Sequence, residues 1–152
     1  MNTLNWEIFG KIYRFFRDDK FAFIDKSKIL VWVLNYNNKE TIIKACKSLI
    51  KENPYNYTVY VVDQGSIDGS PQFIKRKFKN EKKLRLIKFN KNLGVARGRN
   101  YCLKIKKLFN YDFVVMFDSD AQVNFLYWLD LAIYYLKFYS LFAVSWFYSF
   151  VL

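Results

Sequence analysis

The stretch that decides the fold is Tyr57-Thr58-Val59-Tyr60-Val61-Val62-Asp63-Gln64-Gly65-Ser66-Ile67-Asp68-Gly69-Ser70. Its first six residues are β-branched or aromatic and show no polar alternation, so they predict a strand buried on both faces in a parallel sheet. The two glycines and the following Pro71 indicate a turn into a helix. Asp63 would then lie at the carboxyl end of a buried strand.

A second apolar run, Phe113–Phe117, leads directly into Asp118-Ser119-Asp120. Ligands of open α/β sheets bind at the carboxyl ends of the strands. The two runs, interpreted as neighbouring strands, would therefore direct Asp63, Asp118 and Asp120 into one crevice. Carboxylates gathered in this way repel one another unless a cation or a donor-rich ligand offsets their charge. We expect a divalent metal there, with a polar ligand beside it.

Strands and helices are predicted to alternate along the chain, which is typical of a parallel sheet with helices on both faces. We expect one α/β domain over residues 28–152, preceded by an amphipathic helix and lead-in over residues 1–27. The predicted strands cover residues 29–34, 57–63, 84–89 and 112–117, and the predicted helices cover residues 39–51, 71–79 and 95–109. An apolar stripe over residues 125–136 predicts a core helix, and residues 141–152 predict a last strand.

The composition excludes several kinds of chemistry. The chain has no histidine, which excludes Ser-His-Asp catalysis, Cys-His catalysis and histidine metal sites. A metal would have to be held by oxygen ligands, which favours Mg²⁺, Mn²⁺ or Ca²⁺ over Zn²⁺. Cys46 and Cys102 stand far apart on predicted helices, and we interpret them as buried thiols of a reducing compartment.

Positive charge is concentrated in the middle of the chain. The net charge is +12, and residues 71–110 contain 14 Lys and Arg against the single acid Glu81. Three interpretations stay open: a solvated surface, attraction to an anionic membrane, and binding of phosphates. A nucleic-acid partner is not favoured, because the block contains no nucleic-acid-binding motif.

The two ends of the chain bear on its location. Charged residues interrupt the N-terminus before any apolar run that would make a signal peptide. From Leu131 to Leu152 the only charge is Lys137, which fits a buried helix followed by a core strand and leaves a membrane anchor as the alternative. We expect a cytoplasmic protein, with peripheral contact to the cytoplasmic face of the membrane left open.

Four motifs occur in a recognisable order: Val31-Trp32-Val33-Leu34-Asn35-Tyr36-Asn37, Val61-Val62-Asp63-Gln64-Gly65-Ser66-Ile67-Asp68-Gly69-Ser70, Asn92-Leu93-Gly94-Val95-Ala96-Arg97-Gly98-Arg99-Asn100 and Phe117-Asp118-Ser119-Asp120. Together they resemble glycosyltransferase family 2, whose fold is called GT-A, over roughly residues 28–135. The chain has no Gly-x-Gly-x-x-Gly and no Walker loop, so neither a Rossmann dinucleotide site nor a P-loop is indicated. The resemblance implies a Rossmann-like, mostly parallel sheet that binds a nucleotide-diphosphate sugar over its edge.

The resemblance also implies roles for individual residues. The implied nucleotide-sugar site consists of Asn35, Tyr36, Asn37, Asp63, Gly65, Asn92, Gly94, Arg97 and Asp118, and the implied metal ligands are Asp118 and Asp120. Tyr36 would contact the base and Asp63 would pair with it, while Arg97 would lie near the diphosphate. Asp118 would reach the ribose or the metal, and Asp120 would bind Mn²⁺ or Mg²⁺.

The family further implies a reaction. Its members transfer a sugar with inversion from a UDP-, GDP- or dTDP-sugar to a hydroxyl of a glycan, lipid or protein, as in polysaccharide biosynthesis, and a carboxylate base deprotonates the acceptor. The chain departs from the family pattern at Gln64, where Asn or Asp is usual, and at Ile67, where Thr is common. The acceptor half with its base normally follows the Asp-x-Asp strand, yet Asp130 is the only acid after Asp120. We therefore expect a domain that ends after this strand and the following helix, with an incomplete acceptor half and no identified catalytic base.

Three hypotheses on function follow. The chain is a metal-assisted glycosyltransferase, or a nucleotide-sugar-binding fragment or subunit that transfers nothing, or a basic protein associated with membranes or nucleic acid whose acids are structural. Sugar transfer by the isolated chain would exclude the second hypothesis. The third predicts no metal-dependent nucleotide binding, together with lipid or nucleic-acid affinity that fades with salt.

Overall fold

The structure is a computed structural model that describes residues 27–51, 55–123, 128–130, 132–133 and 136. Within these residues one sheet contains β1 (Ile29–Asn35), β2 (Tyr57–Asp63), β3 (Leu84–Lys88) and β4 (Phe113–Phe117). The helices α3 (Lys39–Lys51), α4 (Ser70–Lys77) and α5 (Gly94–Phe109) connect successive strands. The predicted α/β class is confirmed.

Most element bounds agree with the sequence-based prediction to within one or two residues. The helix predicted over residues 71–79 instead ends at Lys77, because Phe78 leaves helical geometry and its N–H closes the last turn on the Ile74 carbonyl. The predicted N-terminal helix and the strand predicted over residues 141–152 lie outside the described residues. In the part of the chain that the structure describes, no helix is long and apolar enough to cross a membrane.

The strands lie in the order β3-β2-β1-β4, and each neighbouring pair is parallel. The chain moves outward from β1 through β2 to β3 and then returns to the other side of β1. The crevice where the strand order reverses is the usual ligand site of an open α/β sheet, and here it lies between β1 and β4. The expectation that Asp63 and Asp118 end neighbouring strands was wrong, since β1 pairs with both β2 and β4 and so separates the two carboxylates.

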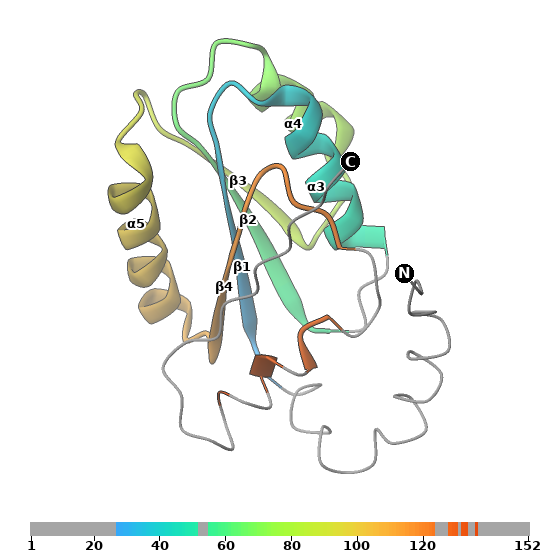
Figure 1. Ribbon diagram of the computed structural model, residues 1–152, viewed down its shortest axis with the longest axis vertical. Coiled ribbons are helices and arrows are strands. Elements are labelled where there is room, and N and C mark those ends of the chain that lie inside the picture. The colour runs from blue at the N-terminus through green and yellow to red at the C-terminus, as the bar shows by residue number, and fades with distance from the viewer. Residues whose placement is uncertain (1–26, 52–54, 124–127, 131, 134–135, 137–152) are drawn as a thin grey trace, which may run out of the picture.

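Helices cover both faces of the sheet, with α5 on one side and α3 and α4 on the other (Figure 1). Leu30 and Trp32 of β1 pack with Val62, Cys102 and Ile105 beneath α5. The alternate residues of β1 point the other way, into a larger cluster that includes side chains of α3 and α4. Both faces of β1 are therefore buried, which explains its almost unbroken apolar sequence.

Two further sequence predictions concern buried residues. Leu129 and Ile133 are 3% and 2% exposed and belong to the larger cluster, so these two members of the apolar stripe after β4 pack in the core as predicted. Cys46 and Cys102 are both buried free thiols, also as predicted. Burial raises the pKa of each thiol to about 12, so neither ionises near neutral pH.

Candidate functional site

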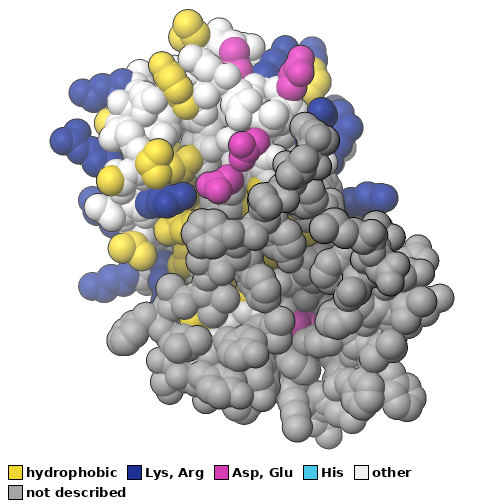
Figure 2. All heavy atoms as spheres, viewed as in Figure 1, with side chains coloured by type: hydrophobic (Ala, Val, Ile, Leu, Met, Phe, Trp, Pro, Cys, Tyr) yellow, Lys and Arg dark blue, Asp and Glu magenta, His cyan; other side chains and the backbone are white. Residues whose placement is uncertain are grey.

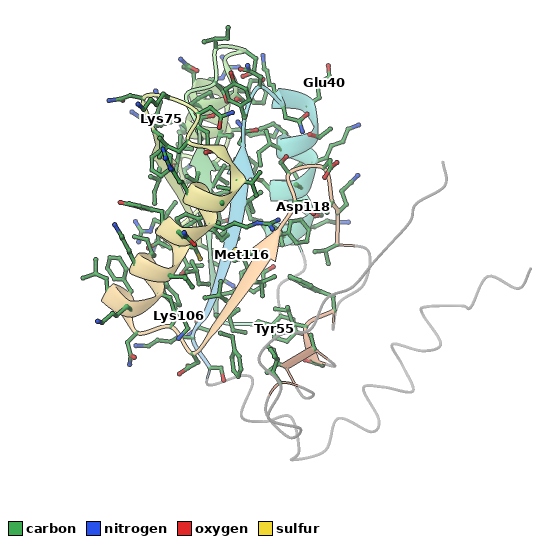
Figure 3. All side chains as sticks on the ribbon, turned by 60° about the vertical axis from the view of Figure 1, so that its left-hand side comes forward. Glu40, Tyr55, Lys75, Lys106, Met116 and Asp118 are labelled. Carbon is green, nitrogen blue, oxygen red and sulfur yellow. The ribbon has the colours of Figure 1, made fainter. Side chains whose placement is uncertain are left out.

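The carboxyl ends of β2, β1 and β4 form the candidate site. Asn35 and Asp63 are the last residues of β1 and β2 and are paired in register. Asp118 follows directly after β4, and Figure 3 shows it beyond the end of that strand. The strand order therefore places Asn35 between the two carboxylates.

A buried polar cluster joins the ends of β1 and β2. The Asn35 amide nitrogen Nδ2 donates to Asp63 Oδ1 at 2.9 Å. The same nitrogen lies 2.8 Å from Ser70 Oγ and 3.2 Å from Ser66 Oγ. The second carboxylate oxygen, Asp63 Oδ2, accepts the Ser66 N–H at 3.0 Å. Asn35 and Asp63 are both 0% exposed, and a carboxylate at such a place requires hydrogen-bond donors of this kind. In this structure Asp63 therefore organises the loop that follows β2.

The loops after β1 and β2 also hold each other. Asn37 has a positive φ of 49°, its N–H donates to Ser66 Oγ, and its Oδ1 accepts the Ile67 N–H. Asn37 is thus a structural member of the site's edge. Each loop exposes one large side chain, Tyr36 at 48% and Ile67 at 91%. Base contact by Tyr36 remains a prediction.

Asp68 connects the second loop to the starts of two helices. Its carboxylate accepts the N–H of Lys39, at the start of α3, and the N–H of Ser70, at the start of α4, each at 2.9 Å. Desolvation by burial would raise the pKa of Asp68, but the hydrogen bonds from Ser70 and Lys39 outweigh it and hold the pKa below its ordinary value. Asp68 therefore stabilises the loop as a charged carboxylate.

Gly65, Gly94 and Asn92 were predicted as site residues, and in the structure they determine the backbone conformation of the adjacent loops. Gly65 has a φ of 76°, and a Cβ placed on it would lie 3.0 Å from the Cα of Lys91, so this glycine lets the loop after β2 touch the loop after β3. Gly94 begins α5 with a φ of 79°, and Asn92 Oδ1 accepts its N–H at 2.8 Å. The contacts of these residues are with the protein's own backbone, and none of them lines the cavity described next.

A cavity of about 300 Å³ opens between α5 and the end of β4. Its apolar lining comes from β1, α5 and β4, and its polar lining comes from one arginine and the loop after β4. The lining residues are Trp32, Leu34, Val95, Arg99, Met116, Phe117, Asp118, Ser119 and Asp120. The cavity therefore lies at the point where the strand order reverses. Asn38 connects the loop after β1 to the loop after β4, because its amide donates a hydrogen bond to Ser119 Oγ at 3.3 Å.

Arg97 was predicted to lie near the diphosphate, whereas the arginine that lines the cavity is Arg99. Arg99 Nη2 lies 3.5 Å from Asp118 Oδ1, and the two side chains are 48% and 73% exposed. An ion pair this exposed contributes little to stability, so both groups can exchange it for a ligand at small cost. Two residues turn a helix by about 200°, which is why Arg97 points elsewhere. The sequence held no signal that favours Arg99, because the direction of each side chain depends on which side of α5 packs on the sheet. In the structure Arg99 lies one helical turn after Val95, which also lines the cavity.

Asp118 and Asp120 are the carboxylates of this cavity, and both are exposed. The described residues contain no cluster of three or more His, Cys, Asp or Glu side chains that would enclose a metal on their own. Two carboxylates that leave open positions nevertheless fit a hard divalent cation, which would take its remaining oxygen ligands from water and from a diphosphate. The donor set is therefore compatible with Mn²⁺ or Mg²⁺.

The chain belongs to glycosyltransferase family 2, because the family described as Glycosyl transferase family 2 matches residues 30–151. It is similar to the mannosyltransferase PcManGT from Pyrobaculum calidifontis, solved in complex with GDP-Man and Mn²⁺, with 27% identity and a TM-score of 0.65 over 73% of this chain and 32% of that one. It is also similar to S. aureus TarS 1-349, with 27% identity and a TM-score of 0.55 over 72% of this chain and 32% of that one.

These similarities confirm the GT-A fold and the family that the four motifs indicated. No curated protein matches the sequence. The chain spans about a third of the length of each of the two solved relatives, 32% in both cases.

Proposed function

We propose that this chain binds a nucleotide-diphosphate sugar at the carboxyl ends of β2, β1 and β4 and supplies the donor site of a glycosyltransferase. The observation that carries the proposal is that Arg99, Asp118 and Asp120 line one cavity where the strand order reverses. A guanidinium pairs with phosphate oxygens, and the two carboxylates suit a metal that bridges to them. Membership of family 2 and the GDP-Man and Mn²⁺ complex of the similar mannosyltransferase support this proposal.

Each polar group has a separate task in this proposal. Mn²⁺ or Mg²⁺ held by Asp118 and Asp120 would offset the charge that develops on the departing diphosphate. Arg99 would leave its exposed ion pair with Asp118 and donate to phosphate oxygens. Tyr36 would contact the base. Asp63 is 0% exposed with both oxygens accepting hydrogen bonds, so it would serve the base by holding the adjacent loop, and direct pairing would require that loop to open.

A second candidate function is nucleotide-sugar binding without transfer by this chain alone. An inverting transfer needs a base to deprotonate the acceptor hydroxyl. Asp130, the only acid after Asp120 in the sequence, is 0% exposed and accepts a hydrogen bond from the Tyr55 hydroxyl at 2.7 Å. The Asp130 carboxylate is therefore part of the core and is not exposed to contact an acceptor hydroxyl, whether the acceptor is a glycan, a lipid or a protein.

Calorimetric titration tests the donor site directly. We expect one of GDP, UDP and dTDP to bind with Mn²⁺ and at least about tenfold more weakly without it. Asp120→Ala should remove the effect of Mn²⁺ and leave thermal unfolding unchanged. The matched control is Glu40→Ala, which removes an exposed acid of α3 that does not line the cavity and should bind like wild type.

The outcomes separate the alternatives. Absence of nucleotide binding with and without Mn²⁺ would contradict the donor site, and full Mn²⁺ dependence in Asp120→Ala would contradict the metal assignment. If the site binds, incubation with nucleotide sugars and candidate acceptors decides between the two functions. Sugar transfer by the isolated chain would rule out the binding-only function, and binding without transfer would support it.

A further inference from the structure

Exposed apolar side chains gather on α5. Among the described residues eight large apolar side chains are exposed, and those on α5 are Val95, Tyr101, Leu103, Leu108 and Phe109. Leu108 is 73% exposed and Leu103 is 56% exposed. A single exposed leucine is ordinary on a soluble protein, but such a concentration on one helix of 16 residues marks a contact surface.

The same helix has no acidic residue and five cations, namely Arg97, Arg99, Lys104, Lys106 and Lys107. It packs on the sheet through Gly98, Cys102 and Ile105. Because each residue turns a helix by about 100°, Leu103 and Lys107 point away from that packed side. In Figure 2 lysine and arginine side chains project along the margin where α5 lies, with apolar side chains between them and no acidic side chain on that margin.

The basic block of the sequence is divided by the fold. α4, on the opposite face of the sheet, ends in Lys75, Arg76 and Lys77. Two of these cations lie against the ring of Phe73, with Arg76 Cζ at 5.1 Å and Lys77 Nζ at 5.8 Å from its centroid. α4 has no exposed large apolar side chain. Positive charge is thus common to both helices, whereas the combination of charge and exposed apolar side chains is found on α5.

We propose that the outer surface of α5, formed by Arg97, Leu103, Lys104, Lys107 and Leu108, binds an anionic lipid membrane. Clustered cations attract a negatively charged partner, and exposed leucines are stabilised by entering an apolar phase. A bilayer with anionic headgroups above acyl chains meets both needs, and the two attractions together give firmer binding than either alone. The inference does not depend on sugar transfer or on nucleotide binding.

Two other occupants fit the surface less well. A free phosphate ligand would engage the cations and leave Leu103 and Leu108 in water. A second copy of the chain would place α5 against the same surface of its partner in a two-fold dimer, and the five cations of each helix would then repel one another. The lipid surface is therefore the occupant that the charges and the leucines favour together.

Vesicle sedimentation with the full chain tests the proposal. The vesicles contain phosphatidylcholine alone or an equimolar mixture with phosphatidylglycerol. Wild type should bind the anionic vesicles and not the neutral ones, and binding should fade as salt is added. The double variant Lys104→Gln/Lys107→Gln should bind about 30-fold more weakly, which is about 1 kcal/mol for each cation. Leu103→Ser/Leu108→Ser keeps every charge and should bind at least about tenfold more weakly.

The matched control is Lys75→Gln/Lys77→Gln, which removes the same charge from α4. Its affinity for anionic vesicles should stay within about threefold of wild type, since these cations would lie beyond a Debye length from the bilayer. All substituted residues are exposed, so unfolding free energies should change by no more than about 0.5 kcal/mol. Equal loss from the α4 pair, or binding that ignores lipid charge, would overturn the proposal. It would also be overturned if the leucine variant left lipid binding intact and converted a dimer to a monomer in sedimentation velocity.

Discussion

Replacing Asp63 with Asn tests whether this carboxylate holds the ends of β1 and β2 together. Its Oδ1 accepts the Asn35 amide at 2.9 Å, and its Oδ2 accepts the Ser66 N–H at 3.0 Å. An asparagine amide has one acceptor oxygen and one donor nitrogen, so with the Asn35 amide in its present orientation the new NH₂ group meets one of the two donors whichever way it turns. The variant would lose a charge-assisted hydrogen bond and bring two donors together at a position that is 0% exposed.

The expected cost follows from these contacts. A hydrogen bond to a charged group contributes about 1.5–3 kcal/mol, and a buried donor without an acceptor costs about 1–3 kcal/mol. The two figures describe overlapping losses, so we expect the free energy of unfolding to fall by about 2–3 kcal/mol. For a chain of 152 residues this corresponds to a fall in melting temperature of about 4–12 °C.

Urea and thermal unfolding followed by circular dichroism measure this change. The matched control is Asp118→Asn, the same exchange at a side chain that is 73% exposed, which should alter stability by less than about 0.5 kcal/mol. If Asp63 acts through the loop, Asp63→Asn should weaken binding of every nucleotide by a similar factor. Unchanged stability together with loss of one nucleotide alone would refute this reasoning and would favour direct pairing of Asp63 with the base.

Three further predictions concern other parts of the chain. Arg99→Ala should weaken nucleotide binding by about tenfold or more in calorimetry, whereas Arg97→Ala, outside the cavity, should leave it unchanged. The opposite result would indicate that Arg97 contacts the phosphates. Gly65→Ala should lower the free energy of unfolding by about 2–4 kcal/mol, because the added Cβ makes a close backbone contact in a left-handed conformation. At Gly69 a Cβ meets open space, so Gly69→Ala should lower it by only about 1 kcal/mol, and equal losses in urea unfolding would contradict this prediction. Both cysteine thiols should resist iodoacetamide in the folded chain and react in urea, because burial raises the thiol pKa to about 12. Mass spectrometry would detect the labelling, and fast labelling of the native chain would contradict the burial of the thiols.

β1, β2 and β4 were predictable because each is a short, almost purely apolar run that ends at, or just before, a polar residue. β2 ends at Asp63 as expected, and β4 ends immediately before Asp118. A strand buried on both faces contains almost only apolar residues, so the first polar residue after the run marks its end. The location of the carboxylates was predictable for the same reason, since carboxylates after such strands must lie at the carboxyl edge of the sheet.

The relative positions of these carboxylates were not predictable in the same way. Strand order depends on pairing between segments far apart in the chain, and here β1 lies between β2 and β4. That order gives Asn35 a neighbour in Asp63 on one side and leaves Asp118 to face Arg99 across the cavity. Local sequence does not reveal the direction in which an arginine points from a helix until the side of the helix that packs on the sheet is known.

By itself, the sequence determined the alternation of strands and helices, the absence of histidine from any site and the family, because these depend on residue type, order and local spacing. The tertiary structure alone decided that the Asp63 carboxylate is buried in a hydrogen-bonded loop, that Arg99 lines the cavity, and that the basic block is divided between two opposite faces. These features arise from contacts between distant segments. Burial and direction are properties of the packed chain, so they appear only when the helices are placed on the sheet.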